Sequence, residues 1–408
     1  MRSIYNAIID RLARVTTSGR RIRELDGLRF IAIASVFVQH VLHVVTDSYA
    51  DESQAHFDLL ARLVRDYRFG VELFFVISGF ILGMPFAAHH LLGKRKVELK
   101  PYYMRRLTRL EPPYVLTLLL WFAVLVFYWG QSATTLWPHF WASLFYVHNF
   151  VYKEFSWINS VAWSLEIEVQ FYILAPLLAM VFAIPHRWFR RAVLLVGVLL
   201  IQQGYKMLAH WAPAISGAGG VGGTIINAAP LFLMGFLLAD IYLVDWKEDP
   251  QPAWWGDWVA GLGWIALPFY FQPHVQAIIR PTFFPLILLV LCYASFRSFH
   301  VRRILASSFI MTVGGMCYSI YLLHYPMIRI LGQYMPVTPL GNHVGANMIL
   351  MSVVMGVPVL IVSSLFFAWV EKPCMVRDWP QQLWARITGK QKHVHLELSQ
   401  HPQDKPVP

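Results

Sequence analysis

Long apolar stretches separated by short, mostly basic segments dominate the chain. A helix that crosses the lipid core needs about 20 mostly apolar residues. Isolated strands cannot satisfy their backbone hydrogen bonds in lipid, so we expect the stretches to be helices. The pattern predicts an all-α, polytopic membrane helix bundle with about ten transmembrane helices. The candidate spans are 28–46, 69–92, 113–129, 162–184, 192–210, 224–243, 254–272, 281–297, 307–331 and 345–370.

The segments between these stretches complete the predicted organisation. Residues 136–150 are too short and polar to span, so we expect an interfacial or re-entrant piece. The glycine-rich segment 212–223 is expected to be a flexible outer loop. Residues 1–24 form a basic cytoplasmic N-terminal segment, 25–373 the membrane domain, and 374–408 a cytoplasmic, partly disordered tail.

Composition supports a membrane protein and explains the charge. The chain of 408 residues is 57% hydrophobic and 14% charged, whereas soluble domains carry about 25% charged residues. The net charge of +11 comes from basic residues between the apolar stretches, which the positive-inside rule explains better than a nucleic-acid partner. Their clusters predict that both termini face the cytoplasm. Cys292, Cys317 and Cys374 form no metal-ligand or disulfide pattern, and we expect no metal.

The first apolar stretch, LDGLRFIAIASVFVQH, carries two ionisable residues. Arg29 and His40 are eleven positions apart, which at about 100° per residue places them on one helix face, roughly 16 Å apart along the axis. Ionisable residues inside a membrane helix are costly and are functional candidates by default. An arginine anchor with a structural core histidine is the alternative that the spacing leaves open.

Depth relates His40 to an acidic residue of another span. His40 lies about 18 Å up its helix from the cytoplasmic foot, and Glu168 about 10 Å down from the outer end of a core about 30 Å thick. The two depths nearly coincide, so a carboxylate–imidazole pair is expected, in which Glu168 orients His40 and raises its basicity. A purely structural buried pair is the alternative.

Arginines precede the third span in YYMRRLTRLEPPY. Arg106 and Arg109 are three positions apart and share a helix face, with Arg105 beside them. Guanidinium forks bind phosphate oxygens, so a phosphate-rich cofactor is expected here, although ordinary membrane anchoring accounts for the same charges. Pro112 and Pro113 are expected to break the chain and hold these arginines at the membrane entrance.

Four further polar or aromatic residues are candidates for acceptor binding: Glu72, Ser78, Trp163 and His324. The alternatives are close helix packing at Ser78–Gly79, an interfacial tryptophan anchor, and a hydrogen-bonded interfacial histidine.

Together these stretches resemble the integral-membrane acyltransferase family 3, which includes bacterial O-acetyltransferases of surface polysaccharides. The resemblance rests on LDGLRFIAIASVFVQH, FGVELFFVISGFIL, YYMRRLTRLEPPY, WSLEIEVQFYILAPLL, YSIYLLHYP and VEKP, in that order. It implies that Arg29 and His40 are essential and that Arg106 and Arg109 lie at the donor site. It also implies that Glu168, rather than Glu166, is the acidic residue of its block.

The resulting hypothesis is a multi-pass O-acyltransferase of the bacterial inner membrane. It would move an acyl group, commonly acetyl from acetyl-CoA or another acyl-CoA, to a hydroxyl of a carbohydrate or lipid-linked glycan of the envelope, in contact with membrane lipids. His40 would act as a general base or carry the acyl group covalently. The polar residues alone also allow a transporter or flippase for a lipid-linked saccharide, or an acyl-carrying partner of a separate transferase.

Overall fold

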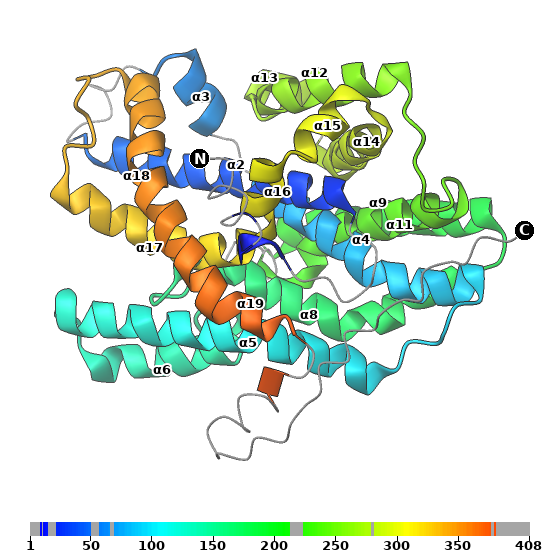
Figure 1. The fold of residues 1–408 in the computed structure, drawn as a ribbon, viewed down its shortest axis with the longest axis horizontal. Coiled ribbons are helices and arrows are strands. Elements are labelled where there is room, and N and C mark those ends of the chain that lie inside the picture. Colours follow the sequence, from blue (N-terminus) through cyan, green and yellow to red (C-terminus); the bar gives the residue numbers. More distant parts are fainter. Residues whose placement is uncertain are drawn as a thin grey trace, which may run out of the picture.

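The computed structural model shows a helical membrane protein (Figure 1). It describes the following residues: 9, 11–14, 22–49, 57–65, 69–212, 223–278, 281–376 and 379–380. No β-strand occurs within these ranges, which confirms the predicted all-α class. Most of segment 212–223 and nearly all of the tail lie outside them.

The helices follow one another in chain order. The α-helices are α2 (Arg23–Asp47), α3 (Leu59–Arg65), α4 (Phe69–Leu92), α5 (Leu99–Ala123), α6 (Ala133–Leu144), α7 (His148–Tyr152), α8 (Trp163–Leu178), α9 (Arg187–Trp211), α11 (Ile225–Val244), α12 (Trp254–Tyr270), α13 (Pro273–Ile278), α14 (Phe284–Arg297), α15 (His300–Leu305), α16 (Ser308–Gly315), α17 (Cys317–Tyr334), α18 (Val344–Phe366) and α19 (Lys372–Cys374). Short 3-10 segments are Ser160–Ala162, Ala179–Ala183 and Pro281–Phe283, and π-helical segments are Val124–Tyr128 and Phe367–Glu371.

Seven helices in the described residues are long and apolar enough to cross a membrane. They are α2, α4, α5 with its π-helical extension, α8 with its flanking 3-10 segments, α9, α11, and α18 extended to Cys374. The protein is therefore a multi-pass membrane protein. The segment 136–150 forms the short helices α6 and α7, which have 12 and 5 residues and are too short to cross.

The remaining three predicted spans are shorter or interrupted in the structure, so they are not among these seven long helices. Helix α12 has 17 residues and α14 has 14, and both lie with α15 in one corner of Figure 1. The stretch 307–331 is divided between α16 and α17 at Met316. Gly314, just before this break, lies so close to α2 that an added Cβ would fall 1.8 Å from the Asp26 carbonyl oxygen. Counting apolar residues could not reveal that this stretch bends around another helix.

Helices α4 and α11 form the most closely packed pair in the core. A Cβ added at Gly79 would meet the Phe232 carbonyl oxygen at 2.2 Å, and one added at Gly235 would meet the Val76 carbonyl oxygen at 2.2 Å. Both backbones can approach this closely because neither residue has a side chain. The sequence expectation of tight packing at Ser78–Gly79 therefore holds for Gly79.

Helix α5 continues through Pro112 and Pro113, so the predicted break is wrong. Proline cannot donate a hydrogen bond to the carbonyl four residues earlier. The Thr108 carbonyl, which Pro112 leaves without that bond, accepts instead from the Trp379 indole at 2.9 Å. Because this acceptor is satisfied by a neighbouring segment, the helix stays continuous and the arginines remain on the same rod as the apolar span.

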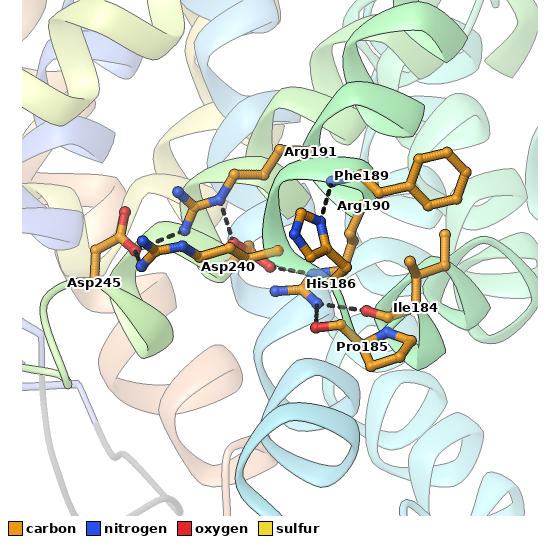
Figure 2. Close-up of polar contacts among 9 residues, drawn as sticks. Ile184, Pro185, His186, Phe189, Arg190, Arg191, Asp240 and Asp245 are labelled. Atoms are coloured by element: carbon orange, nitrogen blue, oxygen red, sulfur yellow. Dashed lines mark hydrogen bonds and ion pairs between the residues drawn. The ribbon is translucent and has the colours of Figure 1, made fainter.

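A buried ion cluster joins α9 to α11 (Figure 2). Asp240 has no exposed surface, and its carboxylate accepts from Nε of Arg190 and, at 2.7 Å, from Nε of Arg191. Arg191 also donates to Asp245 at 2.9 Å, and Arg190 to the Ile184 carbonyl at 2.5 Å. Two arginines that the sequence assigned only to membrane orientation therefore hold two helices together.

The orientation that the basic clusters predict, with both termini in the cytoplasm, can be tested by labelling. With both termini inside, a cysteine introduced at Lys96 is expected to be accessible only from the cytoplasmic side, and one at Glu52 only from the outside. Impermeant thiol labelling of intact cells and inverted vesicles measures this. Labelling of both positions from the same side would contradict the orientation.

Candidate active site

The predicted donor arginines line a large cavity, called here the basic cavity. It has a volume of about 1240 Å³, and Arg105, Arg106 and Arg109 all lie on its wall. One end is lined by Lys94 and Lys96, which lie between α4 and α5, and by Lys100 in the first turn of α5. The wall also includes Ser78, Ser164, Glu168 and Tyr321, at the first turns of α8 and within α4 and α17. The cavity thus connects a strongly basic mouth to a polar group between the helices.

Arg106 is fixed in place by aromatic residues. Its guanidinium lies 3.6 Å from the Tyr102 ring centroid and 5.7 Å from that of Tyr172, and its Nη1 donates to the Tyr102 carbonyl at 2.8 Å. The Nε–H groups of Arg106 and Arg109 are buried and have no acceptor among the residues that the structure describes. Buried donors without partners are costly, and an anionic ligand with several oxygens would satisfy them. These residues therefore fit a phosphate-bearing cofactor.

Arg29 lines the same cavity, so the structure brings it together with the donor arginines. It is 8% exposed, and its Nη1 donates to the Asp26 carboxylate at 2.5 Å. Asp26, three residues before it, is only 2% exposed. Sequence analysis did not select Asp26, although an acidic residue one helical turn from a buried arginine is a usable signal of an ion pair.

His40 is paired with His324, not with Glu168 as predicted. His40 Nδ1 lies 2.8 Å from His324 Nε2, and the ring centroids are 5.0 Å apart. The Tyr325 ring covers His40 from a centroid distance of 4.6 Å. Equal depth in the membrane does not show which neighbouring helix a side chain faces. Helix α2 packs against α17 and α4, and Glu168 on α8 packs with α4.

The hydrogen bonds around His324 determine which His40 nitrogen is free. His324 has no exposed surface, and its Nδ1 lies 2.8 Å from the Tyr321 carbonyl and 3.0 Å from the Ile320 carbonyl. Carbonyls only accept, so His324 Nδ1 carries a proton and its neutral ring accepts at Nε2. His40 must then donate from Nδ1, which leaves the lone pair of His40 Nε2 available for chemistry.

The local structure of α17 follows from Pro326. This proline cannot bond the Leu322 carbonyl, which accepts instead from the Trp121 indole at 3.2 Å and from the Asn159 amide at 3.1 Å. The turn that carries His324 is thereby anchored to α5 and to the segment before α8. A fixed backbone at this turn keeps the histidine pair in register.

Glu168 instead accepts a hydrogen bond from Ser78. The Ser78 hydroxyl lies 2.8 Å from Glu168 Oε1, and both residues line the basic cavity. The remaining predicted acceptor-binding residues, Glu72 and Trp163, are not among the described residues that line this cavity, and neither is His324. Trp163 contacts the Phe155 ring at a centroid distance of 5.9 Å.

Tyr321 stands at the boundary between the cavity and the histidine pair. It lines the cavity, and its ring centroid lies 5.7 Å from that of His324. Its hydroxyl donates to the Val161 carbonyl at 2.8 Å and accepts from Ser164 at 2.7 Å. Sequence analysis did not identify Tyr321, because a tyrosine in an apolar helix gives no signal that distinguishes a boundary residue from an interfacial anchor.

Comparison with known proteins identifies the class. Residues 22–370 match the model of an acyltransferase domain, so this membrane protein belongs to that family, and the resemblance seen in the sequence is confirmed. Among curated proteins, the peptidoglycan O-acetyltransferase OatA of Listeria monocytogenes is 24% identical over 391 residues, which cover 89% of this chain and 57% of OatA. The O-acetyltransferase OatA of Staphylococcus aureus is 25% identical over 341 residues, covering 78% of this chain and 52% of that protein. The chain spans about half the length of these relatives. No solved structure gives a significant match.

Proposed function

We propose that this protein transfers an acyl group from an acyl-CoA to a hydroxyl of a cell-envelope carbohydrate. The observation that carries the proposal is the basic cavity, which combines unsatisfied arginine donors at its wall with a path toward the helix bundle interior. Relatives named as O-acetyltransferases support acetyl as the acyl group. The membrane-spanning helices are consistent with the bacterial inner membrane as the proposed location.

The charges along the cavity favour one orientation of the donor. Phosphates would bind to Arg105, Arg106 and Arg109 near the basic mouth, because guanidinium groups bind phosphate oxygens through paired hydrogen bonds. The thin pantetheine arm would extend between the helices toward Ser78, Glu168 and Tyr321. The thioester would then lie beside Tyr321, next to the histidine pair.

The acceptor would approach His40 from the opposite side. His40 Nε2 accepts the proton of the acceptor hydroxyl, whose oxygen attacks the thioester carbonyl, and the coenzyme A thiolate leaves and takes up a proton. His324 holds His40 in the tautomer with a free Nε2 and is a positioning residue. The same Nε2 lone pair is the nucleophile if the acyl group is carried covalently.

The donor site is tested with arginine variants. Arg109→Ala is expected to weaken coenzyme A binding about 10- to 100-fold, because a charged hydrogen-bond donor to phosphate is lost. Arg109→Lys should retain only part of the affinity, since lysine lacks the guanidinium fork. Calorimetry on purified protein in detergent measures both. Unchanged affinity in Arg106→Ala and Arg109→Ala together would return these residues to the role of membrane anchors.

A further inference from the structure

The basic N-terminal segment reaches into the basic cavity. Among its described residues, Leu12 packs against the buried residues of the membrane domain, and Lys372 donates to the Arg11 carbonyl at 2.7 Å. Arg14 lines the cavity wall itself. The match to the family model begins at residue 22, so these contacts come from outside the family domain.

Arg14 is held in place by the carboxylate that also binds Arg29. Its Nη1 lies 3.4 Å from Asp26 Oδ1, and its side chain is 13% exposed. Its Nε–H is buried and has no acceptor within the described part of the chain. Arg14 therefore presents an unsatisfied donor toward the same space as Arg106 and Arg109.

The charges around Arg14 leave a surplus of positive charge. Burial, followed by the charges of Arg29 and Arg109, lowers the pKa of Arg14 well below its ordinary value, and Asp26 counteracts this only in part. Glu371 is the other carboxylate that faces Arg14, and it also accepts hydrogen bonds from the backbone N–H and hydroxyl of Ser319. Among the described residues, the guanidinium groups of Arg14, Arg29 and Arg109 thus lie near the two carboxylates of Asp26 and Glu371, and an added anion would relieve the repulsion between the guanidinium groups.

We propose that Arg14 is a binding residue for a phosphate group of the acyl donor, so that the N-terminal segment completes the donor site. This inference rests on the proposed function, since it assigns the anion at Arg14 to acyl-CoA. The packing of Leu12 and the hydrogen bond from Lys372 to the Arg11 carbonyl hold residues 11–14 beside the cavity.

The test compares two arginines of the same segment in the full-length protein. Arg14→Ala is expected to weaken coenzyme A binding about 10-fold or more, because a charged donor to phosphate is lost. Arg11→Ala removes the same charge from an exposed side chain and should change the affinity less than about 2-fold. Arg14→Lys should fall between wild type and Arg14→Ala. These variants are expected to fold, because Asp26 still forms its ion pair with Arg29.

Pantetheine, which carries no phosphate, separates binding from structural damage. Wild type and Arg14→Ala should bind it equally. Equal coenzyme A affinities of Arg14→Ala and Arg11→Ala, or a matching loss for pantetheine, would overturn the role of Arg14 while leaving the proposed function intact. Failure of the wild-type protein to bind coenzyme A would overturn both.

Discussion

His40→Ala is expected to abolish acyl transfer while leaving coenzyme A binding intact. Removal of a general base typically lowers the rate about 100- to 10,000-fold. Donor binding should persist because His40 does not line the basic cavity, whereas Arg29, Arg106 and Arg109 do. Transfer of labelled acetyl in membranes gives the rate, and coenzyme A calorimetry on the purified variant gives the binding.

A matched control lies one turn away on the same helix. His43 is exposed, and its ring centroid is 6.5 Å from that of His40. His43→Ala removes an imidazole without touching the His40–His324 hydrogen bond, so it should transfer acetyl at nearly the wild-type rate. A wild-type rate in His40→Ala would refute the proposed chemistry, and loss of the folded protein in this variant would make His40 a structural core residue.

His324 variants test the tautomer argument separately. His324→Gln can place an amide oxygen near the former Nε2 and still accept from His40 Nδ1, whereas His324→Leu cannot. The glutamine variant should recover part of the activity lost in the leucine variant, with the loss in kcat rather than in the donor KM. Equal activities in the two variants would show that His324 only fills space.

Asp240→Asn is expected to destabilise the protein by about 3–5 kcal/mol, because it leaves the buried Arg190 without its charge partner and leaves Arg191 with only the more exposed Asp245. Arg190 and Arg191 are 1% and 8% exposed, so water cannot replace the carboxylate. Thermal unfolding in detergent, followed by tryptophan fluorescence, measures the loss. Coenzyme A affinity of the folded fraction should stay unchanged, since Asp240 does not line the basic cavity.

Asp245→Asn provides the comparison for this second variant. Asp245 pairs with Arg191 at 2.9 Å, but its side chain is 32% exposed, so the loss should be no more than about 1 kcal/mol. Comparable destabilisation by both substitutions would contradict the view that the buried carboxylate, rather than the exposed one, joins α9 to α11.

Much of the fold could be predicted, because a long continuous run of apolar residues indicates a membrane helix. That criterion identified α4 and α11 nearly to the residue, whereas α2 begins at Arg23, before the predicted start at residue 28. It failed at 307–331, where contact between Gly314 and α2 divides the stretch, and at Pro112, whose missing hydrogen bond is compensated by a residue far away in the chain. Both failures depend on tertiary contacts that no local pattern contains.

Local spacing could relate residues of one helix to each other, but it could not identify contacts between helices. The spacing placed Arg106 and Arg109 on one helix face, and in the structure both line one cavity together with Arg105 and Arg29. Their role in donor binding stays a prediction. Counting residues along the helices gives the depths of His40 and Glu168 in the membrane but not the helices that their side chains face. It therefore could not reveal His324 as the partner of His40. Nothing in the sequence indicated that Arg14 lines the cavity, because charged terminal segments of membrane proteins normally lie in water.

The central claim is that the protein uses acyl-CoA as its donor, and one measurement tests it most directly. Purified protein in liposomes, supplied with acetyl-CoA labelled in the acetyl group and with an envelope glycan as acceptor, is expected to release coenzyme A and to transfer the label to the glycan in equal amounts. His40→Ala should do neither. Movement of the glycan across the membrane without thioester cleavage would contradict the account and identify a transporter instead.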